Sequence, residues 1–357
     1  MIPKGTVGEW PSSMVDVSVV IVTHNNENDI EECLASIISQ RPAPREIIVI
    51  DSGSTDGTVQ LASSFTRVRV AEAKRNIGYA AGNNLGIRLA KGEYIVFLNP
   101  DTVVEESWLR ELINAMNSCS SPAICQSRIV RYDNPSILNS DGNCVSIVGF
   151  AWAGSNGLPR NSDQAMKRIA YPSGASMIVR RDIIDQIGGF DEEFFMYHED
   201  LDFGYRAWLS GHSVWCEPKS VARHKYKDVM TDFKFYHLEK NRLMFLIKNL
   251  EPKSLLALLL TLLVVEAGVL MGATTCDKLR AKLHSYVGVL KSLNHVIAER
   301  RRIKAIRKRH DNELWFLFEQ ELPRLGFVPS VFTSSINPLI RVTRRILTRN
   351  QTMEPPA

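Results

Sequence analysis

The stretch Val17–Val22 (VSVVIV) is the first of four apolar segments that decide the fold. It is a nearly continuous run of β-branched residues, which is typical of a strand buried on both faces of a parallel sheet. Three more strands are predicted, with helical segments between them, at Glu46–Ile50, Val68–Ala71 and Tyr94–Leu98. Strands that alternate with helices predict a doubly wound α/β sheet, in which ligands bind beyond the carboxyl ends of the strands.

The pattern continues less regularly as far as Lys227, where we expect the α/β domain to end. Strands are predicted at Ile124–Arg131, Ala175–Val179 and Ser213–Glu217, and a short helix at Arg181–Ile187 is followed by two glycines. The Gly- and Ser-rich stretch between Ser118 and Tyr171 is the least regular part of this half. The sequence therefore predicts one domain over residues 16–227, preceded by a polar extension, 1–15.

The remaining residues, 228–357, have a different composition. Phe233–Leu250 is amphipathic, and Leu255–Met271 is strongly apolar, so an apolar helix is expected at about 254–273. Residues 278–310 contain eleven Lys or Arg and one acid, a net charge of +10. Because the whole chain carries +4, the rest of the sequence is acidic by six charges. We expect a mainly helical region with a basic segment.

The composition excludes several classes of protein. The 357 residues are 45% hydrophobic and 23% charged, which is ordinary for a folded protein and excludes disorder or a collagen-like chain. The six cysteines form no C-x-x-C pair, which disfavours a structural zinc site and suggests reduced thiols in the cytosol. No apolar segment typical of a signal peptide occurs near Met1, so we expect synthesis and folding in the cytoplasm.

Polar residues follow three of the predicted strands. They are Thr23-His24-Asn25, Asp51-Ser52-Gly53 and Asn99-Pro100-Asp101. Neither G-x-x-x-x-G-K-[ST] nor G-x-G-x-x-G follows the first strand, which disfavours P-loop and dinucleotide-cofactor proteins. A carboxylate after one strand can bind a base or a ribose hydroxyl, and one after another strand can hold a divalent cation against a diphosphate.

The order of the motifs resembles the inverting GT-A glycosyltransferases of family 2, and in particular their rhamnosyltransferase-like branch. The similarity extends from about Asp16 to His224. It rests on five segments: Val17–Asn26 (VSVVIVTHNN), Ile48–Thr58 (IVIDSGSTDGT), Arg75–Asn84 (RNIGYAAGNN), Phe97–Thr102 (FLNPDT) and Gly189–Arg206 (GFDEEFFMYHEDLDFGYR). The resemblance implies a GT-A fold, a nucleotide-sugar donor and a divalent cation, Mg²⁺ or Mn²⁺.

The resemblance also assigns residues to the donor and the metal. Thr23 and Asp51 would contact the base and ribose, and Gly78 would allow close approach of the backbone to the donor. The remaining donor-side residues are Asn25, Gly53, Arg75, Asn76 and Asn99. Asp101 matches the metal-binding end of the family's D-x-D-like motif, which is Asn-Pro-Asp here and offers one carboxylate. His224 matches a histidine that some relatives use as a further ligand, although a surface histidine is an equally good interpretation.

Glu199-Asp200 matches the Glu-Asp pair in which the aspartate is the general base. Direct displacement with inversion needs such a base, because the acceptor hydroxyl must lose its proton as it attacks. We expect Asp200 to open a helix and to be kept ionised by the helix N-terminus. The alternative is a set of capping residues. For Asp202 we expect a supporting or capping role rather than a catalytic one. Trp152 and Tyr197 are candidate acceptor-side residues.

The reaction expected is transfer of a single sugar, since the Q-x-x-R-W signature of processive relatives does not occur. The resemblance implies dTDP-rhamnose as donor, with UDP- and GDP-sugars as alternatives, and a lipid-linked or cell-envelope glycan acceptor. Two other functions stay open. One is a sugar-nucleotidyltransferase, although the loop Thr23–Asn28 lacks the glycine and lysine typical of those enzymes. The other is a degenerate transferase that acts as a nucleotide-binding scaffold.

The apolar segment raises the question of a membrane. A single crossing at Leu255–Met271 would place the basic segment outside, against the positive-inside tendency, and Glu266 adds a further cost. We therefore expect an in-plane, re-entrant or buried helix, with the basic segment on anionic headgroups at the cytoplasmic face, as in a peripheral or monotopic protein. Nucleic acid is not an expected partner, because aromatic interleaving is missing. Homodimerisation through the apolar helix is an alternative.

Overall fold

The computed structural model describes residues 14–118, 122–161, 165–226, 229–323 and 330–348, without side chains at 330–333. Cys119, Lys227 and nearly all of the predicted extension 1–15 lie outside the described residues. The chain divides into two compact units. The first unit comprises residues up to Asn143, Ala153–Ala207 and His212–Lys227, and the second comprises Cys144–Trp152, Trp208–Gly211 and the chain from Asp228 onward. The sequence predicts continuous domains, whereas the second unit includes two short segments from within the predicted α/β domain, 16–227.

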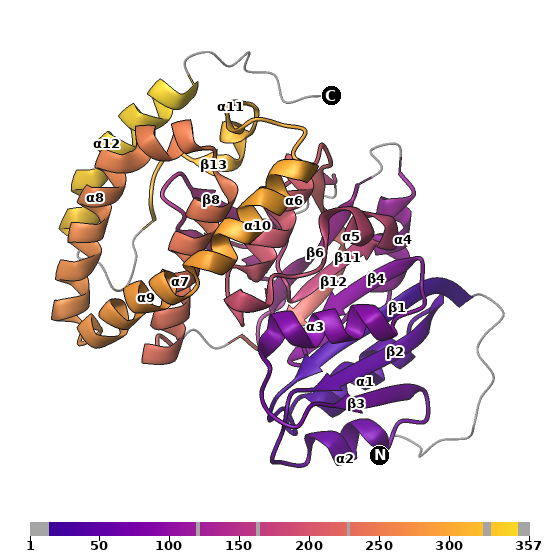
Figure 1. The fold of residues 1–357 in the computed structure, drawn as a ribbon. Coiled ribbons are helices and arrows are strands. Elements are labelled where there is room, and N and C mark those ends of the chain that lie inside the picture. The colour runs from indigo at the N-terminus through magenta and orange to yellow at the C-terminus, as the bar shows by residue number, and fades with distance from the viewer. Residues whose placement is uncertain (1–13, 119–121, 162–164, 227–228, 324–329, 349–357) are drawn as a thin grey trace. The chain divides into compact units, whose positions relative to one another are not determined.

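The first unit is built on one mixed sheet of ten described strands (Figure 1). Its order is β10-β12-β6-β11-β4-β1-β2-β3, with β5 beside β12 and β7 beside β6. Strands β1 to β4 are mutually parallel, and β11 runs antiparallel between β4 and β6. The strands are β1 (Met14–Thr23), β2 (Ala43–Asp51), β3 (Val68–Glu72), β4 (Tyr94–Leu98), β5 (Thr102–Val104), β6 (Ile124–Arg131), β7 (Leu138–Ser140), β10 (Lys167–Arg168), β11 (Ser176–Arg180) and β12 (Val214–His224).

Helices cover both faces of this sheet, as the predicted α/β class requires. On β1, Val17, Val19 and Ile21 pack into one core with α1 and α4. The alternate residues Val20 and Val22 meet α3, where Gly86 and Gly82 leave too little space for a Cβ. The helices are α1 (Ile30–Ile38), α2 (Thr58–Ser63), α3 (Gly78–Leu89), α4 (Trp108–Met116), α5 (Arg181–Ile187) and α6 (Glu199–Leu209), with a 3₁₀ turn at Glu192–Phe194. The strand is therefore buried on both faces, as predicted.

The largest difference from the predicted strands concerns β12. The sequence predicts a strand at Ser213–Glu217 and a separate short strand ending at His224. The structure joins them into one strand, whose register against β6 shifts between Glu217 and Val221. Pro218 lies within this shift, and a bulge is one of the few places where a strand tolerates proline. The longer strand carries His224 to the same end of the sheet as β5.

The second unit is mainly helical, as predicted for residues 228–357. Figure 1 shows its helices in orange and yellow, with α8 and α12 side by side. The buried hydroxyls of Thr261 on α8 and Thr343 on α12 are 2.8 Å apart. The elements are α7 (Asp232–Asn249), α8 (Pro252–Thr275), α9 (Leu279–Lys291), α10 (Leu293–Ile306), α11 (Asp311–Leu314), α12 (Ser330–Thr348), a 3₁₀ turn at Trp315–Leu317, and the small sheet of β8 (Asn143–Ser146), β9 (Ala151–Ala153) and β13 (Phe318–Glu319).

A cluster of four charged side chains lies inside the second unit. Arg242 on α7 pairs with Glu239 at 2.8 Å and also with Glu266 on α8. Lys282 on α9, which is fully buried, pairs with Glu266 at 2.8 Å and also with Glu239. Two cations and two anions cancel, and Tyr286 donates a hydrogen bond to Glu266 at 2.6 Å. Glu266, which sequence reasoning counts only as a cost to the apolar helix, therefore attaches α8 to its neighbours.

Candidate active site

The carboxyl ends of β1, β2 and β4 bring the predicted donor-side residues together. Thr23 is directly opposite Asp51 in the β1–β2 register, and β4 ends beside β1 at Leu98, one residue before Asn99. The chain passes from β1 outward to β3 and then returns to β4 on the other side of β1. Such a reversal of strand order opens the crevice in which α/β proteins bind ligands.

Asp51 is held by its own loop. Its buried carboxylate accepts hydrogen bonds from the Thr23 hydroxyl at 3.1 Å and from the backbone N–H and hydroxyl of Ser54 at 2.9 and 2.5 Å. Thr23 is only 1% exposed, so its hydroxyl is turned toward Asp51. We therefore interpret Thr23 as a residue that positions Asp51, whereas the sequence predicts direct contact with the donor.

Glycine and asparagine shape the loops around Asp51. Gly53 has a φ of +70°, and a Cβ there would come within 2.7 Å of the Arg75 backbone. Asn25, also left-handed with a φ of 57°, accepts a hydrogen bond from the Thr55 N–H at 2.8 Å. The Asn76 amide oxygen accepts hydrogen bonds from Ser52 and from the backbone of the next turn. These predicted donor-side residues lie together, and Arg75 is exposed on the same loop.

Gly78 is closely packed against Phe195. A Cβ at this position, where φ is +80°, would lie 2.5 Å from the Phe195 ring. The Phe195 carbonyl also accepts a hydrogen bond from the Ala80 N–H at 3.1 Å. The missing side chain thus allows α3 to approach the segment before Glu199. The role expected for Gly78 beside the donor stays a prediction.

Asp101 and His224 face each other at the ends of β4 and β12. The carboxylate Oδ1 and the imidazole Nε2 are 3.2 Å apart, yet neither buried atom has a hydrogen bond of good geometry. The other ring nitrogen, Nδ1, lies 3.2 Å from the side-chain oxygen of Asn139. Because that oxygen can only accept, the proton is assigned to Nδ1, and Nε2 keeps a lone pair directed at Asp101.

These two side chains fit a divalent cation. Burial opposes the charge on Asp101, but a protonated His224, the Asp101 backbone N–H and Lys225 together lower the pKa of that carboxyl below its usual range. In the neutral tautomer that can bind a metal, His224 makes no such contribution. A carboxylate oxygen and an unprotonated imidazole nitrogen are suitable ligands for Mn²⁺, and the carboxylate for Mg²⁺. No group of three His, Cys, Asp or Glu with metal-site geometry occurs among the described residues. The protein therefore offers two ligands, and a diphosphate and water would have to complete the shell.

Asp200 lies in the first turn of α6 and is tied to the metal side of the site. Its carboxylate accepts hydrogen bonds from the backbone N–H of Leu201 at 2.8 Å and of Gly174 at 3.1 Å. In the same loop, the carbonyl of Ala175 accepts a hydrogen bond from the Asn99 N–H at 3.1 Å. The segment between Pro172 and β11 thus connects the candidate base with the motif Asn99-Pro100-Asp101.

The charges of Glu199 and Asp200 are only partly compensated. Burial raises the pKa of Asp200 to about 6, although the two backbone hydrogen bonds oppose the shift. Burial and the neighbouring Asp200 raise the pKa of Glu199 well above its usual range, and one of its buried oxygens has no hydrogen-bond partner. The backbone N–H groups at the start of α6 favour the ionised form, as expected, but burial is the larger effect. Asp200 is still mostly ionised at neutral pH.

The segment before α6 is strained. Phe195, Tyr197 and His198 have φ values of 64°, 66° and 65°, in the left-handed region. Each costs roughly 1–2 kcal/mol for a residue with a side chain. Such strain is often found at functional sites, and here it sets the direction in which the chain enters Glu199 and Asp200. Tyr197 is half-buried in this segment, whereas Trp152, also half-buried, lies on β9 in the second unit.

Asp202 has a structural role, as expected. Its carboxylate pairs with Arg206 at 2.8 Å, one turn along α6, and both side chains are buried. The guanidinium of Arg206 also donates to the carbonyls of Ile187 and Gly189 at 2.6 and 2.7 Å. The pair therefore fixes α6 against the end of α5 and leaves Asp200 as the acid of this turn that faces the loop at Gly174.

Sequence reasoning missed three residues that support the site. Gly174 donates to Asp200, Tyr79 donates to the Gly174 carbonyl at 2.7 Å, and Asn139 orients His224. Tyr79 lies within the quoted segment Arg75–Asn84, and Gly174 follows the turn-forming residues Pro172 and Ser173. Their positions in the sequence are therefore a weak signal. Asn139 lies on β7, far from His224 in sequence, and no local pattern identifies it.

Comparison with known proteins gives a consistent result. The model of the family "Glycosyl transferase family 2" matches residues 18–188. A "Low-salt glycan biosynthesis hexosyltransferase Agl10" from Haloferax volcanii is 29% identical over 199 residues, which are 54% of this chain and 61% of that protein. The chain thus spans less than two thirds of this relative. An "N-acetylglucosaminyl-diphospho-decaprenol L-rhamnosyltransferase" from Mycobacterium tuberculosis is 29% identical over 247 residues, or 59% of this chain and 77% of that protein.

The fold also matches solved structures. The crystal structure of GalNAc-T7 with UDP, GalNAc and Mn²⁺ aligns with a TM-score of 0.55 and 18% identity, and the alignment covers 68% of this chain and 49% of that one. At this identity the likeness concerns the fold. With the sheet order and the strand-end residues, these findings confirm the fold expected from the sequence and agree with the expected family. Residues 18–188, just under half of the chain, match glycosyl transferase family 2, and the first unit has the GT-A fold.

Proposed function

We propose that this chain transfers one sugar from a nucleotide-diphosphate donor to a hydroxyl of a lipid-linked or cell-envelope glycan, with inversion at the anomeric carbon. The observation that supports this most is the connection of Asp200 to the Asp101–His224 pair through the loop at Gly174 and Ala175. One general base and one metal-competent pair at the same end of a sheet are what direct displacement of a diphosphate requires.

In this proposal Asp200 is the general base. The acceptor oxygen attacks the anomeric carbon while its proton passes to the Asp200 carboxylate, and the bond from that carbon to the diphosphate oxygen breaks. The hydrogen bonds from Gly174 and Leu201 hold the carboxylate in one orientation. A pKa of about 6 leaves it ionised near neutral pH and basic enough to accept the proton.

Asp101 and His224 would hold Mg²⁺ or Mn²⁺. When bound, the cation would stabilise the negative charge that develops on the departing nucleoside diphosphate. Asp51, fixed by Thr23 and Ser54, would accept a hydrogen bond from the ribose or the base. The exposed Arg75 would lie along the donor near its diphosphate.

The donor we favour is dTDP-rhamnose, with UDP- and GDP-sugars as alternatives. The rhamnosyltransferase among the relatives supports this choice, and its name also supports a lipid diphosphate acceptor. Because nucleotide sugars are made in the cytosol, we place the reaction at the cytoplasmic face of a membrane. Each acceptor is expected to receive a single sugar. The acceptor side would include Tyr197, and Trp152 stays a candidate.

The first test is a nucleotide panel. Purified protein is heated with dTDP, UDP or GDP, each with and without Mn²⁺, and the melting temperature is measured. A ligand that binds only the native state adds about 2.7 kcal/mol to the free energy of unfolding at a hundredfold excess over Kd, and so raises the melting temperature. We expect a metal-dependent shift with one nucleotide, lost in Asp101→Asn.

Activity assays alongside the same panel separate the alternatives. A metal-dependent shift without transfer to any acceptor, and without slow hydrolysis of the donor, would favour a nucleotide-binding scaffold. Formation of a nucleotide sugar from a nucleoside triphosphate and a sugar phosphate would favour a nucleotidyltransferase. Absence of any shift would contradict the donor site proposed for Asp51 and Asp101.

A further inference from the structure

Helix α8 has an unusual distribution of side chains. Leu256, Leu260 and Leu263 are 73%, 67% and 60% exposed, and Leu259 and Met271 are at least half exposed. They recur at the spacing of one helical face. Among the described helices, α8 is the one long and apolar enough to cross a membrane, and 33% of its most apolar window is buried. A face of this size in contact with water would be unfavourable.

The opposite face of α8 mixes small and polar residues with a few apolar ones. Glu266 enters the charged cluster with Arg242 and Lys282. The buried residues are Ser254, Leu258, Thr261, Val265, Gly268, Val269, Gly272 and Ala273. In a helix of a water-soluble core, the large apolar residues point inward and the small or polar ones outward. On α8 large leucines are exposed while small residues lie one turn apart at the contact, a combination typical of helices that face lipid.

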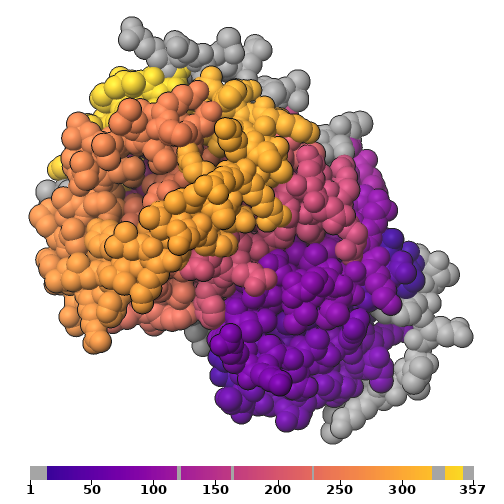
Figure 2. Space-filling model, in the orientation of Figure 1, coloured from indigo at the N-terminus to yellow at the C-terminus, as the bar shows by residue number. Residues whose placement is uncertain are grey.

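The helices next to α8 continue the apolar surface. Exposed apolar residues recur on α9 at Leu283, Val287 and Leu290, and on α12 at Val342 and Ile346. We call these residues, together with Leu256, Leu259, Leu260, Leu263 and Met271, the apolar surface of the second unit. Figure 2 shows the orange and yellow segments of this unit at the surface of the molecule.

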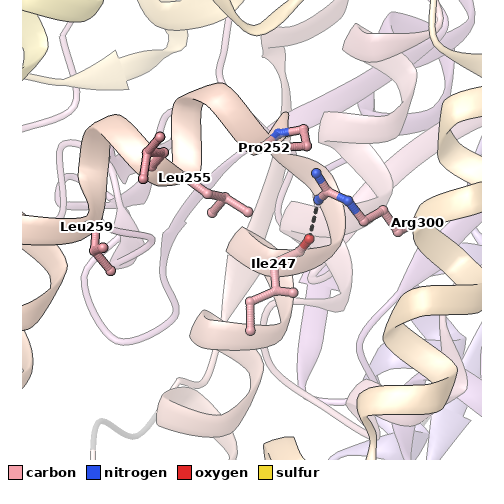
Figure 3. Close-up of a pocket in the computed structure, with 6 residues that line it drawn as sticks. Ile247, Pro252, Leu255, Leu259 and Arg300 are labelled. Carbon is pink, nitrogen blue, oxygen red and sulfur yellow. Dashed lines mark hydrogen bonds between the residues drawn. The ribbon is translucent and has the colours of Figure 1, made fainter.

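A shallow cavity of about 440 Å³ opens beside the first turns of α8. Leu255, Leu256 and Leu259 line it together with Pro252, Ile247 of α7 and Arg300 of α10 (Figure 3). The guanidinium of Arg300 donates a hydrogen bond to the Ile247 carbonyl. The cavity is thus apolar with a single cation among its lining residues, a combination that suits the region where lipid chains meet their headgroups.

Cations accompany the apolar surface. Arg280 and Lys291 of α9 and Arg301, Arg302 and Lys304 of α10 are exposed. A second copy of the chain on the same surface would bring these like charges toward each other, which is unfavourable. Anionic lipid headgroups would complement them. Charge therefore favours a membrane over a homodimer.

We propose that the apolar surface of the second unit inserts into one leaflet of an anionic membrane, with α8 parallel to the membrane plane and the cations of α9 and α10 among the headgroups. Glu266 holds the middle of α8 to Arg242 and Lys282, so a crossing helix would draw these charges into the bilayer. The inference deepens the proposed lipid-linked acceptor. Nucleotide binding in solution does not depend on it, so the two can fail separately.

The first experiment is flotation of the full chain with vesicles of phosphatidylcholine, alone or mixed with phosphatidylglycerol. We expect binding to the mixed vesicles, reduced about tenfold or more in the triple variant Leu256→Gln, Leu260→Gln, Leu263→Gln. The control is Leu158→Gln, at a leucine of the first unit that is 56% exposed, and this variant should bind as the wild type does. The pair Arg301→Glu and Arg302→Glu should reduce binding to the anionic vesicles specifically.

A depth measurement distinguishes insertion from crossing. A cysteine replaces Leu256, Leu263 or Met271 in a chain with Cys119→Ser, Cys144→Ser and Cys276→Ser. The three natural cysteines that remain are buried. Each new cysteine carries a fluorescent label that is quenched by lipids with quenchers at known depths. An in-plane helix predicts similar depths for all three. A crossing helix would place Leu263 deepest, and that result would overturn the proposal.

Two other results would also overturn it. One is vesicle binding by the triple variant equal to that of the wild type, with the nucleotide-induced melting shift intact. The other is a wild-type chain that is a dimer without lipid and does not bind vesicles, together with a triple variant that is a monomer. The surface would then be a subunit interface. Vesicle binding without any nucleotide shift would instead refute the donor site and leave this inference standing.

Discussion

Buried charge is arranged differently in the two units of this protein. In the second unit, Glu239 and Glu266 are each paired with both Arg242 and Lys282, so the cluster is neutral. In the first unit, Glu199 and Asp200 are adjacent carboxylates, and the interactions described for them are with backbone N–H groups and with each other. The cations of the second unit lower the pKa of Glu239 despite its burial, whereas burial raises the pKa of Glu199.

The difference separates charges that stabilise the fold from charges kept for a reaction. In a neutral cluster each charge is stabilised by its partners, and removal of one partner lowers the stability of the fold. An incompletely compensated carboxylate lowers stability, and such groups concentrate at functional sites. The candidate base Asp200 and its neighbour Glu199 belong to this second kind. Substitution of a charged residue should therefore lower stability in the second unit, whereas in the first unit it should lower activity with little loss of stability.

Lys282→Met should give the largest loss of stability. It leaves two buried carboxylates with one cation, and breaking such a pair costs about 3–5 kcal/mol. The measurement is chemical unfolding followed by circular dichroism. In the double variant Lys282→Met, Glu266→Leu the Glu239–Arg242 pair remains neutral, and most of the stability should return. A double variant as unstable as the single one would mean that packing, not charge, explains the loss.

Asp101→Asn should lower kcat/KM about 100-fold, comparable to the loss of one donor that stabilises a developing oxyanion. The variant should also lose the dependence of nucleotide binding on Mn²⁺, while the free energy of unfolding changes little. Titration calorimetry with and without Mn²⁺ measures this. Asp133→Asn, an exposed carboxylate of the same unit, is the matched control and should behave as the wild type does. Unchanged Mn²⁺ dependence in Asp101→Asn would place the metal elsewhere.

The pH dependence of kcat/KM should reveal the raised pKa in the Glu199–Asp200 pair. The base must be ionised, so activity falls as pH drops through about 6, by about tenfold per unit below that value. Because the two carboxyls interact, the acid limb of the pH profile reports the titration of the pair. Burial, and not the charge of Glu199, is the cause that raises the pKa of Asp200, so Glu199→Gln should leave the limb near 6. An acid limb near 4 in the wild type would contradict the raised pKa.

Glu199→Gln should have the smallest effect, a gain in stability. The pKa of Glu199 is raised in the folded state, so its ionisation destabilises the fold increasingly as pH rises above its unfolded value near 4.5. The amide removes this cost. The melting temperature at pH 8 should rise by about 2 °C or more relative to wild type, with a smaller gain at pH 5. A loss at both pH values would show that the carboxylate is needed for packing.

The sequence predicts the sheet well because its information is local. The β-branched run at β1 and the segments at β4 and β6 carry their own periodicity, and Asp51, Asp101 and Glu199-Asp200 follow recognisable patterns. What it misses depends on distant pairing. Asn139 meets His224 through β6 and β7, Gly78 makes room for Phe195, and Glu266 is neutralised by residues on two other helices. No window of sequence contains both partners of such contacts.

The most direct test of this account measures activity and stability together in Asp200→Asn. The account predicts that kcat falls about 10³-fold, within the range expected for loss of a general base, while nucleotide binding persists and the melting temperature stays equal or rises. Transfer within a few-fold of the wild-type rate would contradict the assignment of the base. A fall in melting temperature like that of Lys282→Met would contradict the contrast between the two units.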